Sequence, residues 1–201
     1  MPTTPRRWVI SDTHFGHANI IHHAERPFRT IDEMNEALVA NWNDTVRDGD
    51  TVYHLGDFSG PPMNRRIERI AERLRGRIVL ITGNHDRVTP RLADTFTRVT
   101  GPQKLHTPVM DIPGVVLSHV PLHSAGTDEP GSLQVIGNLH GHIHQRTSPT
   151  PRHCNVCVEH TGYRPITLEE AVERLAEQIR TGRSRNLEAN IERKGAPDDR
   201  R

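Results

Sequence analysis

The sequence predicts an α/β (α+β) fold in which two β-sheets pack between helices. In the first half of the chain, strand-like apolar runs alternate with segments of helical periodicity, which favours parallel pairing of the strands. From residue 97 onward, short strand-like runs are separated by Gly and Pro turns, which indicates antiparallel pairing. A length of 201 residues suits one domain with its own core.

The first strand is expected at residues 8–11 and the second at residues 51–55. Between them, residues 30–33 (Thr-Ile-Asp-Glu) form a capping box, which is a common start of a helix. Apolar side chains then recur at helical spacing, at Met34, Leu38 and Trp42. This pattern predicts an amphipathic helix that packs against the strands.

Later elements follow from the same signals. A second helix is marked by Met63, Ile67, Ile70 and Leu74. Further strands are expected at residues 78–82, 109–112, 115–118, 135–140 and 155–158. A capping box at residues 167–170 begins a closing helix, whose inner face is Ala171, Val172, Leu175 and Ile179. We expect one domain over residues 1–180 and a polar tail over 181–201, either a poorly anchored helix or disordered.

Short motifs with oxygen and imidazole side chains follow the strand-like runs. They are Asp12-Thr13-His14, Gly56-Asp57, Gly83-Asn84-His85-Asp86, Ser118-His119 and Gly141-His142-Ile143-His144. Each motif alone is a weak signal, but their order and their positions after strands support one another. Together they supply the hard and borderline ligands that a two-metal hydrolytic site draws from many strand ends.

The spacing within these motifs also suits a metal site. Residues i and i+2 at a strand end point to one side, so Asp12 and His14 can converge on one ion. The same holds for His142 and His144. Asp57 lies on a turn after a strand, where one carboxylate can bridge two cations.

This series of motifs resembles that of the calcineurin-like metallophosphoesterases, which read DxH, GD, GNH(D/E), H and GHxH. The resemblance covers residues 8–170 and is closest to small bacterial and phage members that open with Ser-Asp-Thr-His-Phe-Gly-His, as residues 11–17 do. It implies a four-layer αββα sandwich of two mixed β-sheets flanked by helices. It also implies two divalent metal ions about 3.5–4 Å apart, with a bridging hydroxide that attacks phosphorus.

The resemblance assigns ligands by position. One metal would take Asp12, His14, Asp57 and His144, and the other would take Asp57, Asn84, His119 and His142. The resemblance favours manganese. Because no predicted ligand is a thiolate, iron, zinc, nickel and cobalt stay open.

The expected catalytic residues lie beside these ligands. By the resemblance, His85 contacts the substrate phosphate and assists the leaving oxygen. Asp86 is expected to accept the other ring proton of His85 and fix its tautomer. His17 is either a further donor to the phosphate or a packing residue, and His140 is expected to orient the loop of His142 and His144.

Arginines near the predicted ligands leave two interpretations open. Arg26, Arg65 and Arg66 either bind phosphate or, as the more favoured interpretation, belong to a solvated face.

The predicted function is a metal-dependent phosphoric ester hydrolase. Small diesters or cyclic nucleotides, including 2′,3′-cyclic ones, are favoured substrates, because the chain is short and lacks an insertion that would cap the site. A phosphomonoesterase, a dinucleoside polyphosphate hydrolase and a nuclease stay open, since the same site serves all of them. A non-catalytic scaffold is disfavoured because His85, Asp86 and every predicted ligand are present.

Composition narrows the partners and the compartment. A net charge of +1 gives no strong case for nucleic acid or for a membrane surface. No stretch is apolar enough for a signal peptide or a membrane span, so we expect a cytoplasmic protein, of unknown oligomeric state, that acts on a small phosphoester. A zinc site at Cys154 and Cys157 with His153 and His160 is disfavoured, because structural zinc sites usually use two separated pairs of ligands.

Overall fold

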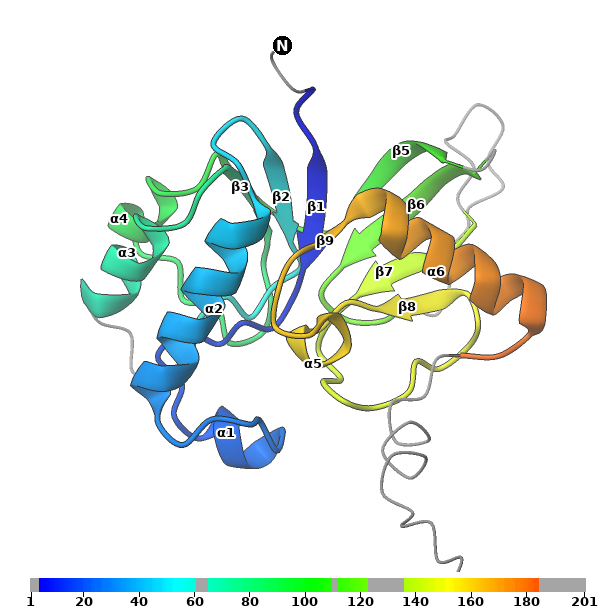
Figure 1. Cartoon of the computed structure of the whole chain (residues 1–201). Coiled ribbons are helices and arrows are strands. Elements are labelled where there is room, and N and C mark those ends of the chain that lie inside the picture. The colour runs from blue at the N-terminus through cyan, green and yellow to red at the C-terminus, as the bar shows by residue number, and fades with distance from the viewer. Residues whose placement is uncertain (1–3, 61–64, 110–111, 123–135, 185–201) are drawn as a thin grey trace, which may run out of the picture.

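A computed structural model describes residues 4–60, 65–109, 112–122 and 136–184. Its strands form two sheets that lie side by side, with helices packed against them (Figure 1). The five-stranded sheet has the order β4-β3-β2-β1-β9, and the four-stranded sheet has the order β5-β6-β7-β8. Both sheets are mixed, as the resemblance implied.

The strands of the first sheet are β1 (Arg7–Ile10), β2 (Thr51–His54), β3 (Arg77–Ile81), β4 (Arg98–Thr100) and β9 (Ile166–Thr167). Those of the second sheet are β5 (Gln103–Val109), β6 (Ile112–Ser118), β7 (Asn138–His140) and β8 (His153–Asn155). The helices are α1 (Ile20–His23), α2 (Ile31–Thr45), α3 (Arg65–Ala71), α4 (Pro90–Ala93), α5 (Val158–Thr161) and α6 (Leu168–Thr181). None of the helices within the described ranges has both the length and the apolar character needed to cross a membrane.

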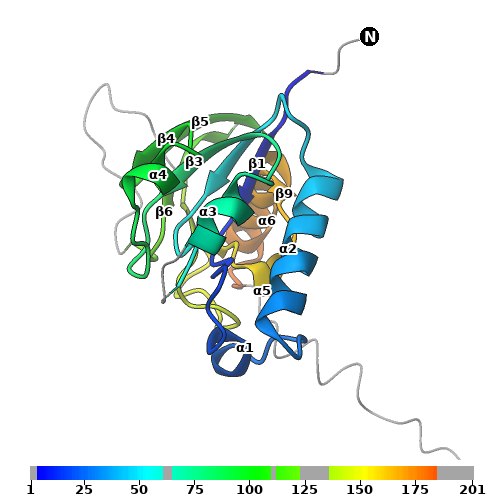
Figure 2. The same cartoon turned by 90° about the vertical axis from the view of Figure 1, so that its left-hand side faces the viewer.

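Alternation along β1 separates two cores. Trp8 and Ile10 point to the side of α2, where they join a cluster that contains Met34 and Trp42. Val9 points to the opposite side, into a cluster formed by residues of both sheets and of α6. Figure 2 shows α3 and α4 in front of the first sheet and α6 behind it. Each face of β1 is therefore buried, which fits its apolar sequence.

The two predicted capping boxes begin the two long helices. The Thr30 hydroxyl accepts a hydrogen bond from the Glu33 N–H at the start of α2, at 3.1 Å. The Thr167 hydroxyl accepts one from the Glu170 N–H at the start of α6, also at 3.1 Å. The last helix ends at Gly182 in a left-handed conformation, with φ of 67°.

Strand direction in the second half differs from the prediction. The pair β5 and β6 is antiparallel, but β3 pairs with β4, β6 with β7 and β7 with β8 in parallel. Gly and Pro turns mark where a strand stops, but they do not show to which end of the sheet the chain returns. The segments between β6, β7 and β8 are long enough to bring the chain back to the same end.

The last expected strand is shorter in the structure, and parts of other expected elements lie outside the described residues. The strand expected at residues 155–158 stops at Asn155, and Val158 begins α5. The expected elements at Met63, residues 110–111 and residue 135 lie outside the described residues, as do residues 185–201 of the expected tail. The division into a domain over residues 1–180 and a tail over 181–201 therefore stays a prediction.

Candidate active site

The predicted ligands lie in the loops that follow the carboxyl ends of parallel strands. Asp12 and His14 follow β1, Asp57 follows β2, Asn84 follows β3, His119 follows β6, and His142 and His144 follow β7. Main-chain pairing continues past the strands, because the N–H groups of Asp12 and His14 bond to the carbonyl oxygens of Gly56 and Asp57, each at 3.0 Å. The topology thus brings distant segments together beyond the carboxyl ends of strands from both sheets, where ligands often bind in such folds.

The backbone of these loops is strained. Positive φ angles occur at Asp12 (60°), His14 (50°), Asp57 (52°), His142 (72°) and His144 (49°). Non-glycine residues rarely adopt this left-handed region, and each instance costs about 1–3 kcal/mol. Its concentration at the predicted ligands indicates that the loops are shaped to aim these side chains.

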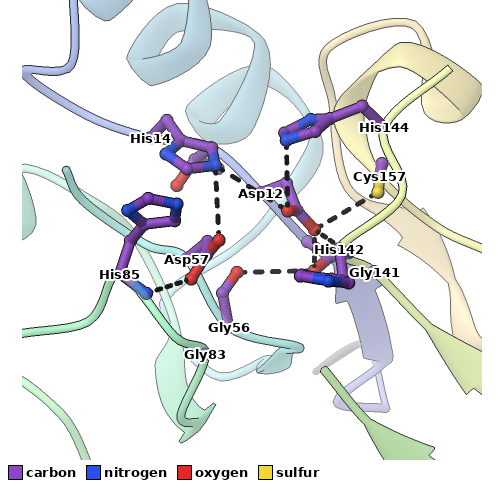
Figure 3. Close-up of polar contacts among 12 residues, drawn as sticks. Asp12, His14, Gly56, Asp57, Gly83, His85, Gly141, His142, His144 and Cys157 are labelled. Carbon is purple, nitrogen blue, oxygen red and sulfur yellow. Dashed lines mark hydrogen bonds and ion pairs between the residues drawn. The ribbon is translucent and has the colours of Figure 1, made fainter. Parts of the chain in front are cut away.

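A first group of ligand atoms comes from Asp12, His14 and Asp57. His14 Nε2 lies 3.8 Å from Asp12 Oδ1 and 3.5 Å from Asp57 Oδ2, and His144 Nε2 lies 3.9 Å from Asp12 Oδ1 (Figure 3). In the described part of the chain, the buried atoms Asp12 Oδ1 and His14 Nε2 have no hydrogen-bond partner. Since buried polar atoms are normally paired, a cation between them fits this group.

A second group contains Asp57, His119 and His142. His119 Nε2 lies 3.3 Å from Asp57 Oδ2 and 2.9 Å from Asn84 Oδ1. The Nδ1 atom of His142 lies 3.2 Å from the same His119 nitrogen. Imidazole, carboxylate and amide donors suit a divalent cation, and Asp57 belongs to both groups.

Asp86 holds two of the ligand loops together. Its carboxylate accepts hydrogen bonds from the main-chain N–H groups of Asp57 (2.9 Å), Phe58 (2.9 Å) and Gly83 (2.8 Å). Asp57 Oδ1 in turn accepts from the His85 N–H at 2.8 Å. Asp86 was expected to orient the His85 ring, but no hydrogen bond joins the two side chains among the described residues. The observed contacts of Asp86 instead hold the main chain of the two loops in place.

His85 and His17 stand side by side next to the first group. The centroid of the His85 ring lies 5.3 Å from that of His14 (Figure 3). It lies 5.7 Å from the centroid of the His17 ring. His85 is exposed, whereas His17 is partly buried with its Nδ1 3.1 Å from Nδ1 of His14. Burial, together with the nearby His14 and His85, lowers the pKa of His17 to about 4, so this ring is neutral at pH 7.

Asp12 is fixed from the side that faces away from His14. Its Oδ2 accepts hydrogen bonds from Ser11 Oγ (2.5 Å), the His142 N–H (2.9 Å) and Cys157 Sγ (3.2 Å). Burial and the nearby Asp12 carboxylate raise the pKa of the Cys157 thiol well above its usual value. A Cβ atom on Gly141 would collide with Ser11 Oγ and Asp12 Oδ2, so the close approach requires glycine.

Cys154 and Cys157 lie in different environments. Both are free and buried; Cys154 lies in the core between the sheets, and Cys157 forms a group of possible ligand atoms with Asp12 and His144. The structure thus places a thiol beside the site, although the motifs indicated only oxygen and imidazole ligands.

The position of Arg26 agrees with neither interpretation made from the sequence, phosphate binding or a solvated face. It is 4% exposed, and its guanidinium donates to the carbonyl oxygens of Asp12 (2.6 Å) and Thr13 (3.0 Å). It also bonds to Glu159 Oε1, so it neither faces solvent nor is directed at a phosphate. Arg66 pairs with Asp32 at the surface, and the side chain of Arg65 lies outside the described set.

His140 and Glu159 both support the loop of His142 and His144. His140 Nδ1 lies 2.8 Å from the Gly141 carbonyl oxygen, and its Nε2 lies 2.9 Å from Ser148 Oγ. Glu159 Oε1 lies 3.3 Å from His144 Nδ1. The sequence patterns assigned no supporting role to Ser11, Cys157 or Glu159. Ser11 opens the motif at residues 11–17, and Cys157 entered only the disfavoured zinc site, whereas Glu159 belongs to no motif.

Known proteins are similar to this chain in sequence or in fold. Residues 6–158 match the calcineurin-like phosphoesterase superfamily domain. An uncharacterized protein of Methanocaldococcus jannaschii is 35% identical over 172 residues, which cover 81% of this chain and 86% of that protein. The gene 66 protein of Mycobacterium phage D29 is 31% identical over 174 residues, covering 74% of this chain and 85% of that protein. A solved protein of unknown function from Aquifex aeolicus has a TM-score of 0.65 at 25% identity, covering 85% of this chain and 99% of its own.

Proposed function

Because the chain belongs to the calcineurin-like phosphoesterase superfamily, we propose that it is a phosphodiesterase that depends on two divalent metal ions. The proposed substrates are small diesters or cyclic nucleotides, including 2′,3′-cyclic ones. The observation that carries the proposal is the position of Asp57, whose carboxylate belongs to two adjoining groups of ligand atoms.

The proposed ligands divide between these groups. Asp12, His14, Asp57 and His144 would hold one ion, and Asp57, Asn84, His119 and His142 would hold the other. We propose manganese, with the other borderline divalent ions as alternatives. When bound, such ions supply positive charge to a phosphate and make water nucleophilic at neutral pH.

The side chains proposed to contact the substrate are His85, as proton donor, and His17, as hydrogen-bond donor. The exposed ring of His85 lies beside His14, while its main-chain N–H is held by Asp57, so the side chain is free to reach a substrate oxygen. Donation by His85 to the leaving alkoxide would contribute about 10²- to 10⁴-fold to the rate. His17, neutral at pH 7, carries one ring N–H that can donate a hydrogen bond to a phosphate oxygen.

Exposure of the site supports a preference for diesters. Asn84, His85 and His142 are all exposed in the described structure. An open site admits a phosphorus atom that carries two organic groups, whereas a narrow pocket would favour a terminal phosphate.

The proposal is tested by turnover of bis-p-nitrophenyl phosphate and of p-nitrophenyl phosphate. The protein is first treated with a chelator and then resupplied with Mn²⁺. We expect metal-dependent diester hydrolysis well above monoester hydrolysis. Dominant monoester turnover would assign a phosphomonoesterase instead, and no turnover of either by protein that binds Mn²⁺ would contradict hydrolysis of simple phosphoesters.

A further inference from the structure

We propose that Glu159, held in place by Arg26, is a positioning residue that orients the His144 ring toward a metal ion. The inference rests on the proposed metal-dependent function and deepens it. Glu159 lies in the short helix α5, outside every motif that marked the site. Its Oε1 lies 3.3 Å from Nδ1 of His144, whose Nε2 faces Asp12 Oδ1 at 3.9 Å.

This contact selects one form of the imidazole. A carboxylate accepts a proton-bearing nitrogen, so His144 donates from Nδ1 to Glu159. Nε2 then keeps its lone pair, and it points toward Asp12, as Figure 3 shows. A carboxylate behind a histidine ligand fixes the ring and raises its basicity, and such partners strengthen metal binding.

Arg26 ties this carboxylate to the other half of the site. Its Nε lies 2.9 Å and its Nη2 lies 2.8 Å from Glu159 Oε1, and the same guanidinium bonds to the carbonyl oxygens of Asp12 and Thr13. Arg26 and Glu159 are separated by 133 positions in the sequence. The Arg26 side chain therefore links the Asp12 loop to the carboxylate that contacts His144.

The burial of the Arg26–Glu159 ion pair indicates that it positions side chains and contributes little to stability. The side chains of Arg26 and Glu159 are 0% and 5% exposed. Removing two charges from water is costly, and a buried ion pair is often no more stabilising than apolar side chains of similar size. The contacts with His144 and Arg26 both fall on Oε1, while Oε2 has no hydrogen-bond partner in the described part of the molecule. Among the described residues, the Glu159 carboxylate is therefore positioned by its contacts with His144 and Arg26 alone, and not by a hydrogen-bond network that would satisfy both of its oxygens.

The test compares Mn²⁺ binding to the chelated full chain with Glu159→Ala, Glu159→Gln and a control, Glu170→Gln. The control alters a carboxylate that pairs with Arg174 at 2.6 Å on α6. Calorimetric titration should show that Glu159→Ala weakens one of two Mn²⁺ affinities by about 10- to 100-fold, with a smaller change in the other. Glu159→Gln keeps an acceptor oxygen for Nδ1–H, so it should fall between Glu159→Ala and the wild type. The control should match the wild type.

The results for the wild type and for the Glu159 variants distinguish failure of the proposed function from failure of the role of Glu159. Wild-type chain that binds no Mn²⁺ would overturn both. Wild-type chain that binds two ions and hydrolyses the diester, beside Glu159 variants that bind both ions as tightly, would overturn only the role of Glu159. Thermal melting in chelator checks folding; if Glu159→Ala fails to fold, Glu159→Gln decides, and wild-type affinities in that variant with a normal melting temperature would refute the inference.

Discussion

Asp57 divides its two carboxylate oxygens between different tasks. Oδ1 accepts the His85 N–H at 2.8 Å, which fixes the orientation of the carboxylate. Oδ2 lies 3.5 Å from Nε2 of His14 and 3.3 Å from Nε2 of His119, so one atom faces both groups of ligands. At the scale of single residues, the two proposed metal positions are therefore linked through one oxygen.

His85 should affect turnover without affecting metal content. We expect His85→Ala to lower kcat by about 10²- to 10⁴-fold, because a proton donor to the leaving group is lost. Its bond to Asp57 uses the main chain and survives the substitution. Steady-state kinetics and Mn²⁺ stoichiometry check this, with the exposed His106→Ala as the control. Full turnover by His85→Ala would rule out the proposed role.

His119 should make the metal-free protein sensitive to pH. Burial disfavours its charge, but the hydrogen bond with Asp57 and the negative charge of Asp12 raise the pKa of His119 to about 8. A raised pKa in the folded state stabilises the protein below the unfolded value of about 6.5, and this contribution is lost as pH rises through 8. The contribution should amount to about 2 kcal/mol.

Urea unfolding in chelator measures this contribution as the difference between wild type and His119→Gln. The difference should be largest at acidic pH and should fall by about 2 kcal/mol by pH 9. A difference that does not change with pH would show that His119 carries no raised pKa.

Gly141 should tolerate no side chain. A methyl group there would collide with Ser11 Oγ and Asp12 Oδ2, so Asp12 would have to move. We expect Gly141→Ala to weaken Mn²⁺ binding by at least about 10-fold, because displaced ligands lose their geometry. Gly101→Ala is the matched control, since a Cβ there meets nothing within 4 Å. Equal Mn²⁺ affinity in the two variants would contradict the tight packing against Asp12.

At the scale of elements, α6 closes the core between the sheets. It contacts β1 and β9 of the first sheet and β5, β7 and β8 of the second. Leu175 on this helix is fully buried, so Leu175→Ala should lower the free energy of unfolding by about 2–5 kcal/mol. Glu173→Ala, at an exposed position of the same helix, should change it by less than about 0.5 kcal/mol. Comparable losses in urea unfolding would show that α6 does not carry the core.

Elements with strong local signals could be predicted from the sequence, and strand partners could not. Thr30 and Thr167 mark the starts of α2 and α6 in the sequence, because a capping box acts within one helical turn. The motif positions also placed Asp12, Asp57 and His119 after strands, where the structure has them. The direction of β7 and β8 depends on how the chain returns to the sheet, which short apolar runs do not encode.

At the scale of the whole molecule, the site forms where five strand ends from two sheets meet. Topology therefore explains why residues as distant as Asp12 and His144 face each other at 3.9 Å. The residues that support these ligands were harder to predict. Arg26 and Glu159 carry no local pattern, and their contact spans 133 positions, so only the folded chain reveals it.

The most direct test of the two-metal site is a crystal structure with Mn²⁺, using anomalous scattering at the manganese edge. We predict two peaks that both contact the Asp57 carboxylate. One peak should also contact Asp12 and His14, and the other should contact His119 and His142. A single peak, or two peaks that do not share Asp57, would contradict the two-metal site.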